Sequence, residues 1–451
     1  MFKKGKNIKF FWWVYKKTIN LIDWVAHLVI SRDPEEFFFR KKIFKVIPEA
    51  ARKKHVYITG RSWSGKSELI KWFVYGYLKK AQSNKTWLRK HIIVMDPHWD
   101  LAKEIRDFDI LDSQDVIYVD PFYKEGYSPV INPFYLPKKE KNQANIDRMT
   151  QELVKAFEQL MSDRELSSSM KALLMPCIAT LLRLENSSIL DLQNFMDIDD
   201  VPEDLIAAWK QSDNPTHKRF FNKWFHKKIY NRTKNSLYLK IQNTLNSSIF
   251  SDVVLWKNTI YLEKILNNSS GKVIIFNLAK WRLWTESSHA LWQFVLALIR
   301  VVALKRDMIN KNNRVPIHFF IDEFHNYMWD EILEWLAELR KYRVHFWLAS
   351  QILWQWMSGK DRHLVLSNTN VKIIWQNTNK TLKKISKEAG VDIELLENLK
   401  TWKFVIKRGT FKEFIFDMPG YLIWERHEKN KKEKEWMKKH QISNYYKKLE
   451  G

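Results

Sequence analysis

One stretch of the chain, "YITGRSWSGKSELIKWF" (57–73), has the residue types and the spacing of a phosphate-binding loop. Its two glycines, lysine and serine are Gly60, Gly65, Lys66 and Ser67. In such a loop the backbone N–H groups face phosphate oxygens, the lysine reaches the β- and γ-phosphates, and the serine hydroxyl binds Mg²⁺. The residues predicted to bind a nucleotide here are Gly60, Arg61, Ser62, Trp63, Ser64, Gly65, Lys66, Ser67 and Glu68.

A second stretch supplies carboxylates. In "IHFFIDEFHN" an apolar run ends at Asp322 and Glu323. Asp322 is predicted to hold Mg²⁺ through its hydration shell, and Glu323 to orient or deprotonate the attacking water. An apolar strand that ends in Asp-Glu is common in any fold. Because this one occurs with a phosphate-binding loop in the same chain, it indicates nucleotide hydrolysis.

A third run, "VHFWLASQ", ends in Gln351. The alternative here is an ordinary strand terminus. If its strand lies beside the strand of Asp322, the glutamine can hydrogen-bond the γ-phosphate or the attacking water. Gln351 is therefore a candidate catalytic residue.

Short apolar runs rich in β-branched and aromatic residues must position these side chains. They are "VYITG" (56–60), "HIIVMDP" (91–97), "DVIYVDP" (115–121), "KVIIFNLA" (272–279), "PIHFFIDE" (316–323), "VHFWLASQ" (344–351) and "VKIIW" (371–375). Several are apolar at nearly every position, which is typical of parallel strands covered on both faces. Helical patterns such as 67–80 and 286–305 separate most of them. The succession predicts an α/β fold with a mainly parallel, doubly wound sheet.

The pattern changes along the chain. Residues 141–251 show helical periodicity without a convincing strand, which predicts an all-α insertion domain. The α/β domain is then formed by 51–140 and 252–425. Residues 1–50 are a basic, aromatic N-terminal segment, and 426–451 form a basic C-terminal tail, expected as a solvated helix or a loose end.

Composition narrows the class of partner. The chain has 76 Lys and Arg against 51 Asp and Glu, a net charge of +25, which favours a polyanion such as nucleic acid or an anionic membrane surface. Cys177 is the only cysteine, which excludes an internal disulfide and a multi-cysteine metal site and favours the cytoplasm.

Charges interrupt every apolar run of the N-terminal segment before the roughly 18 residues of a spanning helix, so no transmembrane helix is predicted there. No signal peptide is predicted either. A surface-lying amphipathic helix stays open. The expected location is cytoplasmic, with a peripheral position at the inner face of the membrane as the alternative.

Seven stretches together resemble a known family. They are "GRSWSGKS", "VMDPHWDLAKEI", "VINPF", "KVIIFNLAKWRLWTESSHALWQFVLALI", "IDEFHNY", "LAELRKYRVHFWLASQ" and "VLSNTNVKIIW". In this order they resemble the coupling-protein ATPases of conjugation and type IV secretion, members of the FtsK/HerA superfamily of hexameric DNA-pumping motors. The resemblance covers roughly residues 50 to 415.

The resemblance implies a RecA-like P-loop core with an all-α insertion, ATP and Mg²⁺ as cofactors, and a homo-hexameric ring around single- or double-stranded DNA. Secretion or membrane-channel proteins are further expected partners. It also implies an arginine that acts in the neighbouring subunit; Arg340 fits best, with Lys341 and Arg343 as adjacent alternatives. Asp96 matches the acidic end of the family's second strand and is carried over as a nucleotide-site residue.

Three functions stay open. The leading hypothesis is an ATP-driven DNA translocase. The alternatives are a pilus-assembly or protein-export ATPase of the same superfamily, and a non-hydrolysing DNA-binding scaffold. The family's coupling members usually carry N-terminal membrane helices, which this sequence is not predicted to have, so a soluble translocase is also compatible.

Tryptophan and glycine counts are abnormal in opposite directions. The chain has 11 Gly and 22 Trp, where average usage gives about 32 Gly. Tryptophan stands where the resembled family usually has glycine at Trp63, Trp99, Trp281, Trp284, Trp292 and Trp402. We hypothesise that the gene reads UGA as glycine and that the printed sequence reads it as tryptophan; the alternative is genuine tryptophans. An indole at residue 63 would make nucleotide binding doubtful, whereas glycine there gives an ordinary loop.

Overall fold

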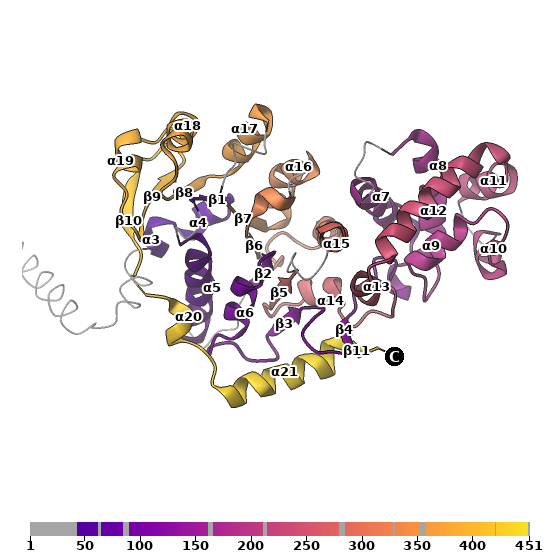
Figure 1. Ribbon diagram of the computed structural model, residues 1–451, viewed down its shortest axis with the longest axis horizontal. Coiled ribbons are helices and arrows are strands. Elements are labelled where there is room, and N and C mark those ends of the chain that lie inside the picture. The colour runs from indigo at the N-terminus through magenta and orange to yellow at the C-terminus, as the bar shows by residue number, and fades with distance from the viewer. Residues whose placement is uncertain are drawn as a thin grey trace, which may run out of the picture.

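The structure is a computed structural model, and it describes residues 43–61, 65–83, 90–160, 166–210, 214–278, 285–327, 330–351, 358–419 and 421–449 (Figure 1). Most of the N-terminal segment therefore lies outside the described residues. None of the helices in the described ranges is long and apolar enough to cross a membrane.

A nine-stranded sheet forms the centre, and seven neighbouring strands in it are parallel. These strands are β1 (Val56–Thr59), β2 (His91–Asp96), β3 (Val116–Val119), β5 (Val273–Asn277), β6 (Ile317–Ile321), β7 (Val344–Ser350) and β8 (Val371–Ile374). Their order across the sheet is β8-β1-β7-β6-β2-β5-β3. Each one falls within a predicted apolar run, so the predicted α/β class is confirmed.

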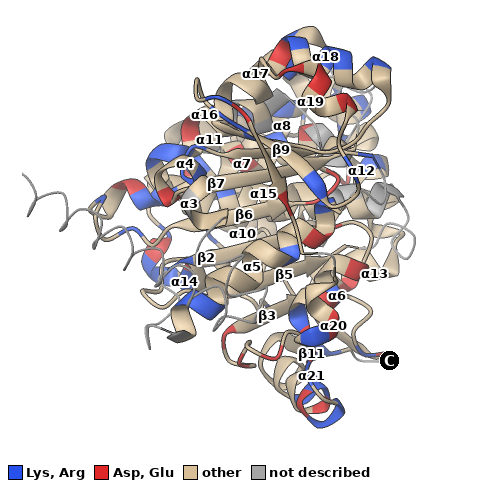
Figure 2. Cartoon of the chain, turned by 90° about the vertical axis from the view of Figure 1, so that its left-hand side faces the viewer, with Lys and Arg blue, Asp and Glu red and all other residues tan. Residues whose placement is uncertain are grey.

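Both faces of the sheet are buried, which explains the continuous apolar runs. In β6, Phe319 and Phe320 point into different hydrophobic cores. The core on one face includes residues of α15 (Thr285–Lys305) and α16 (Asp330–Glu338), and the other includes α5 (Lys66–Ser83) and α6 (Asp100–Arg106). Figure 2 shows charged residues on the surrounding helices, whereas β3, β5 and β6 carry none.

Two antiparallel strands, β9 (Lys403–Arg408) and β10 (Phe414–Asp417), extend the sheet beyond β8, and the sequence pattern did not predict them. They were missed because their outer residues are charged or exposed, so no continuous apolar run marks them. The available signal was the turn at Gly409, whose φ of +50° favours glycine.

Among the described residues between β4 (Tyr127–Pro129) and β5, every element is a helix. They are η2 (Lys138–Glu140), α7 (Gln143–Leu160), α8 (Ser168–Leu181), α9 (Ile189–Phe195), α10 (Glu203–Lys210), α11 (Pro215–Lys223), η3 (Lys228–Tyr230), α12 (Asn231–Leu245), α13 (Ser248–Val254) and α14 (Leu262–Leu266). Most of them gather beside the sheet in Figure 1. Arg300 of α15 joins the two parts, because it pairs with Glu152 of α7 at 3.1 Å and with Glu338 of α16 at 3.3 Å.

The remaining helices flank the sheet. They are α3 (Phe44–Val46), α4 (Glu49–Arg52), η4 (Arg306–Met308), η5 (Phe324–Tyr327), η6 (Leu339–Tyr342), α17 (Gly359–Asn368), α18 (Asn379–Ala389), α19 (Ile393–Glu397), α20 (Ile423–Arg426) and α21 (Lys431–Tyr445).

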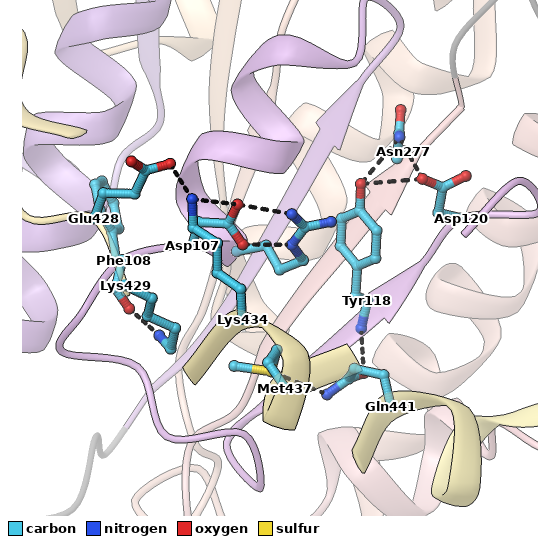
Figure 3. Close-up of polar contacts among 11 residues, drawn as sticks. Asp107, Phe108, Tyr118, Asp120, Asn277, Glu428, Lys429, Lys434, Met437 and Gln441 are labelled. Carbon is cyan, nitrogen blue, oxygen red and sulfur yellow. Dashed lines mark hydrogen bonds and ion pairs between the residues drawn. The ribbon is translucent and has the colours of Figure 1, made fainter. Parts of the chain in front are cut away.

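The C-terminal segment forms a mostly exposed helix, one of the two expected forms, but one side of this helix is packed against the sheet. We call α21 together with β11 (Tyr446–Lys448) the C-terminal strap; β11 pairs with β4. The side chain of Gln441 accepts a hydrogen bond from Tyr118 N at 2.9 Å (Figure 3). It also donates to Val116 O at 2.8 Å. The hydroxyl of Tyr446 donates to Tyr118 O at 2.8 Å. Side chains of the strap thus occupy the outer edge of β3, where another strand would otherwise pair.

Four buried histidines predict a loss of stability in acid. Burial lowers the pKa of His55 to about 4 and those of His91 and His345 to about 3. It also lowers the pKa of His318 well below its usual value. Unfolded histidine titrates near 6.5, so the unfolded chain takes up protons first as the pH falls, and each histidine removes about 1 kcal/mol per pH unit. Asp96 acts in the opposite direction, because its pKa is raised to about 7 in the folded protein and the folded state therefore holds one proton there that the unfolded state lacks. This single proton is outweighed by the four that the histidines of the unfolded chain take up.

We therefore expect the urea midpoint to fall between pH 6.5 and pH 5, with a shallower fall in a His345→Leu variant. A midpoint that does not change over this interval would contradict neutral buried histidines.

Candidate nucleotide-binding site

The residues with predicted chemistry emerge where neighbouring parallel strands end. The loop that begins at Gly60 follows β1, Gln351 follows β7, and Asp322 follows β6. The strands lie in the order β1-β7-β6, so their carboxyl ends share one edge of the sheet. This edge is where open α/β sheets bind ligands.

A direct contact joins the loop to the acidic pair. The hydroxyl of Ser67 donates a hydrogen bond to Asp322 Oδ2 at 2.8 Å across 255 residues of sequence. Lys66 Nζ donates hydrogen bonds to the carbonyl oxygens of Gly60 at 3.0 Å and Arg61 at 3.2 Å. Burial lowers the pKa of this lysine. The structure therefore brings the predicted phosphate ligands and the predicted metal ligand together.

Not all predicted loop residues join this cluster. Ser62, Trp63 and Ser64 lie outside the described residues. The carboxylate of Glu68 accepts a hydrogen bond from Ile423 N at 2.6 Å, so it faces α20 and only its backbone is available to the cluster.

The carboxylates of Asp96, Asp322 and Glu323 are buried near one another. Burial, followed by the charge of Glu323, raises the pKa of Asp322. Asp96 is fully buried, and burial followed by Asp322 raises its pKa to about 7. Its two oxygens accept hydrogen bonds from His98 N at 2.7 Å and Ala102 N at 2.9 Å. Asp96 thus lies near Asp322, and it also holds the first turn of α6.

The donor set suits magnesium bound with a nucleotide. A hydroxyl and carboxylates are ligands that Mg²⁺ prefers, and it usually keeps waters and takes phosphate oxygens as well. In the part of the chain that the structure describes, no group of three or more His, Cys, Asp or Glu is arranged to hold a metal alone. A nucleotide's phosphates and water would therefore have to complete the coordination shell.

Glu323 is held in an unusual backbone conformation. Its φ of 44° is left-handed, which costs a non-glycine residue on the order of 1–3 kcal/mol and is frequent at functional sites. Gln351 Nε2 donates to Glu323 Oε1 at 2.5 Å, and His325 Nδ1 lies 3.3 Å from Glu323 Oε2. The sequence reasoning missed His325; its position two residues after Glu323 was the only available signal.

Solved structures with similar folds include a conjugative coupling protein and VirB4. A bacterial conjugative coupling protein, TrwBdeltaN70, in an unbound form has a TM-score of 0.58 at 14% identity, with 82% of this chain and 85% of that chain covered. TrwB in complex with ADP and Mg²⁺ gives 0.58 and 14%, covering 82% and 86%. The fold is that of a conjugative coupling protein. VirB4 of Thermoanaerobacter pseudethanolicus gives 0.51 at 15%, covering 83% and 91%.

Sequence comparison adds one segment to the coupling-protein likeness. Residues 316–397 match the family model described as the TraM recognition site of TraD and TraG. This segment includes Asp322, Glu323 and Gln351. No curated protein sequence matches the chain significantly.

Arg340 lies away from the cluster of its own chain. It is in η6, which directly precedes β7, so it is at the opposite end of the strands from Gln351. Lys341 pairs with Glu338 at 3.6 Å, and the guanidinium of Arg343 donates to Arg314 O at 2.9 Å. Arg340 is exposed and makes no hydrogen bond or ion pair with a described side chain. Of the three candidates, it is the one whose side chain has no hydrogen-bond or ion-pair partner among the described residues.

Two of the suspected tryptophans have backbones that favour glycine. The φ angles of Trp99 and Trp402 are 88° and 65°. The ring of Trp402 also approaches the loop, since a Cβ built on Gly65 would lie 3.8 Å from it. Trp292 is buried within α15 and shows no such backbone, and Trp63, Trp281 and Trp284 lie outside the described residues.

Glycine and alanine variants at positions 99 and 402 should differ in stability, and the difference reports the strain of the backbone conformation alone. Both replacements remove the indole, but only glycine adopts a positive φ without strain. We expect Trp99→Gly and Trp402→Gly to be more stable than the matching alanine variants by roughly 1–2 kcal/mol. At exposed Trp224, whose φ is −118°, glycine should bring no advantage. Denaturant unfolding checks this; alanine equal to glycine at 99 and 402 would contradict the glycine hypothesis.

Proposed function

We propose that this chain is an ATP-hydrolysing DNA translocase of the coupling-protein type that works as a ring of identical subunits. The observation that carries the proposal is the 2.8 Å contact between the Ser67 hydroxyl and the Asp322 carboxylate, beside the Glu323–Gln351 pair. A phosphate-binding loop, a metal ligand and a candidate base then adjoin a single triphosphate site.

Each residue has a role in this mechanism. Lys66 would bind the β- and γ-phosphate oxygens, and Ser67 and Asp322 would hold Mg²⁺, which would supply neutralisation of the charge that develops on the phosphates. Glu323 orients the attacking water and accepts its proton. Gln351, which is bonded to Glu323, links the state of the γ-phosphate to the end of β7.

The coupling-protein structures support the choice of cofactors. TrwB has been solved with ADP and Mg²⁺ and with non-hydrolysable analogues of ATP and GTP. The hydroxyl and carboxylates of the present site fit the same kind of ligand.

A ring explains why Arg340 has no partner within its own site. In the proposed homo-hexamer, Arg340 reaches the γ-phosphate bound by the next subunit and stabilises the charge of the transition state. The match of 316–397 to a TraM recognition model supports a protein partner of the DNA-processing machinery in addition to DNA. The free thiol of Cys177 supports a cytoplasmic location.

The likeness to VirB4 supports a second candidate, a protein-export or pilus-assembly ATPase with the same site. ATP turnover measured with and without single- and double-stranded DNA tests the choice. We expect DNA to stimulate turnover. Turnover that DNA leaves unchanged would favour the export ATPase, and a complete lack of turnover in the assembled ring would favour a scaffold.

A further inference from the structure

The outer part of the helical insertion has an unusual charge pattern. Residues 214–251 contain eight Lys and Arg and no Asp or Glu. Other basic stretches without a carboxylate occur, such as 69–95 with six Lys and Arg, but 214–251 is the longest run of the chain without an Asp or Glu. The segment includes α11, η3 and α12, and Figure 1 shows α11 and α12 in the helical lobe beside the sheet, with α11 on the side away from the sheet.

Six cations of this segment are exposed, and we call them the basic face. They are Lys218, Arg219, Lys223, Lys227, Lys228 and Arg232. None of the six forms an ion pair with a described carboxylate, whereas several cations nearer the sheet do: Lys305, for example, lies 2.7 Å from both Glu140 and Glu263. The basic face therefore keeps its positive charge available for a ligand.

A buried aromatic cluster lies among the helices that carry the basic face. The rings of Trp209 and Phe221 stack with centroids 4.6 Å apart, and Phe225 packs against Phe221 at 5.2 Å. Lys234, which is nearly buried, places its ammonium 3.6 Å from the centroid of Phe225. Packing thus fixes the helices that present the six cations, and Lys228 and Arg232 stand one helical turn apart.

The neighbours of the cations narrow the class of ligand. The exposed polar residues among and beside them are uncharged amides, a hydroxyl and an imidazole, namely Thr216, Asn222, His226 and Asn235, which can bond phosphates without repelling them. Unpaired cations on a carboxylate-free surface complement a polyanion, and phosphate neutralisation with counterion release supplies most of the affinity of such a contact.

We propose that the basic face binds the sugar-phosphate backbone of DNA, at a place separate from the strand inside the ring. The inference rests on the proposed function for the identity of the polyanion. Such a surface would hold DNA near the motor whether or not a nucleotide is bound, and it would show little sequence preference.

Binding of labelled single-stranded and duplex DNA to the full chain, measured without nucleotide across a salt series, tests this. The variant carries Lys223→Gln, Lys227→Gln, Lys228→Gln and Arg232→Gln. The slope of log affinity against log salt should fall by about 3, because each lost phosphate contact removes roughly 0.7–0.9. Affinity at low salt should drop by about tenfold or more.

A matched control removes the same charge from exposed lysines of α21: Lys431→Gln, Lys432→Gln, Lys438→Gln and Lys439→Gln. The proposal requires a clearly smaller loss in this control. Unchanged affinity in the first variant, or equal losses in both, would overturn it. Stronger competition by polyglutamate or by anionic lipid vesicles than by unlabelled DNA would also overturn it, in favour of an acidic protein or a membrane.

The binding assay uses no ATP, so its outcome is independent of hydrolysis. If the chain lacks DNA-stimulated turnover but the first variant alone loses DNA affinity, the result supports DNA binding by the basic face and contradicts the proposed motor function.

Discussion

A Glu323→Gln variant should bind ATP with Mg²⁺ about as well as the parent and hydrolyse it roughly 10²–10⁴-fold more slowly, the usual contribution of a positioned general base. The amide has the shape of the carboxylate, so it can still accept the hydrogen bond from Gln351 Nε2. It cannot take a proton from the attacking water. The substitution therefore separates binding from chemistry.

Single-turnover hydrolysis and the affinity for a fluorescent nucleotide measure the two effects separately. Glu394→Gln, an exposed position at the start of α19, makes the same chemical change away from the site and should leave turnover as it is. Normal turnover in the Glu323 variant would remove this residue from the catalytic role. Loss of nucleotide binding would show instead that the substitution disturbs the backbone held at a φ of 44°.

The largest stability effect is expected at Gln441. Its side-chain amide satisfies three buried backbone groups: it accepts from Tyr118 N, and it donates to Val116 O at 2.8 Å and to Ser113 O at 3.2 Å. A leucine fills a similar volume but offers no polar atom. Each unsatisfied buried group costs about 1–3 kcal/mol, so we expect Gln441→Leu to lower the free energy of unfolding by at least about 3 kcal/mol.

Urea unfolding followed by circular dichroism measures this loss. Asn444→Ala is the control, because Asn444 lies one turn away on the exposed side of α21 and should change stability by less than about 0.5 kcal/mol. Equal effects at the two positions would show that the strap does not stabilise the edge of β3.

The sequence predicted the parallel strands because each of them is buried on both faces, which leaves a continuous apolar run. It did not predict β9 and β10, whose outer residues are charged. It allowed for the helix of the C-terminal strap but did not predict the contacts of this helix with β3, because Gln441 stands among lysines and glutamates. Its partners are more than 320 residues away, and local composition carries no information about them.

In the candidate site, too, local motifs could be predicted and long-range side-chain contacts could not. The loop and the acidic pair could be predicted because each is a local motif at the end of a strand. Two contacts could not: the carboxylate of Glu68 turns to α20, and His325 approaches Glu323. Both depend on side-chain directions that spacing does not specify. For Arg340, the sequence could propose a residue type but not its target, since the proposed acceptor belongs to another subunit.

The strap also has a consequence for biosynthesis. Strand β3 is translated 323 residues before the glutamine that bonds Tyr118 N. At about 5–20 residues per second, a nascent chain would leave this edge without its final partners for roughly a quarter of a minute to a minute. Unpaired edges of this kind recruit other strands and promote aggregation. We therefore expect nascent chains of this protein to depend on chaperones until the last turns of α21 have left the ribosome.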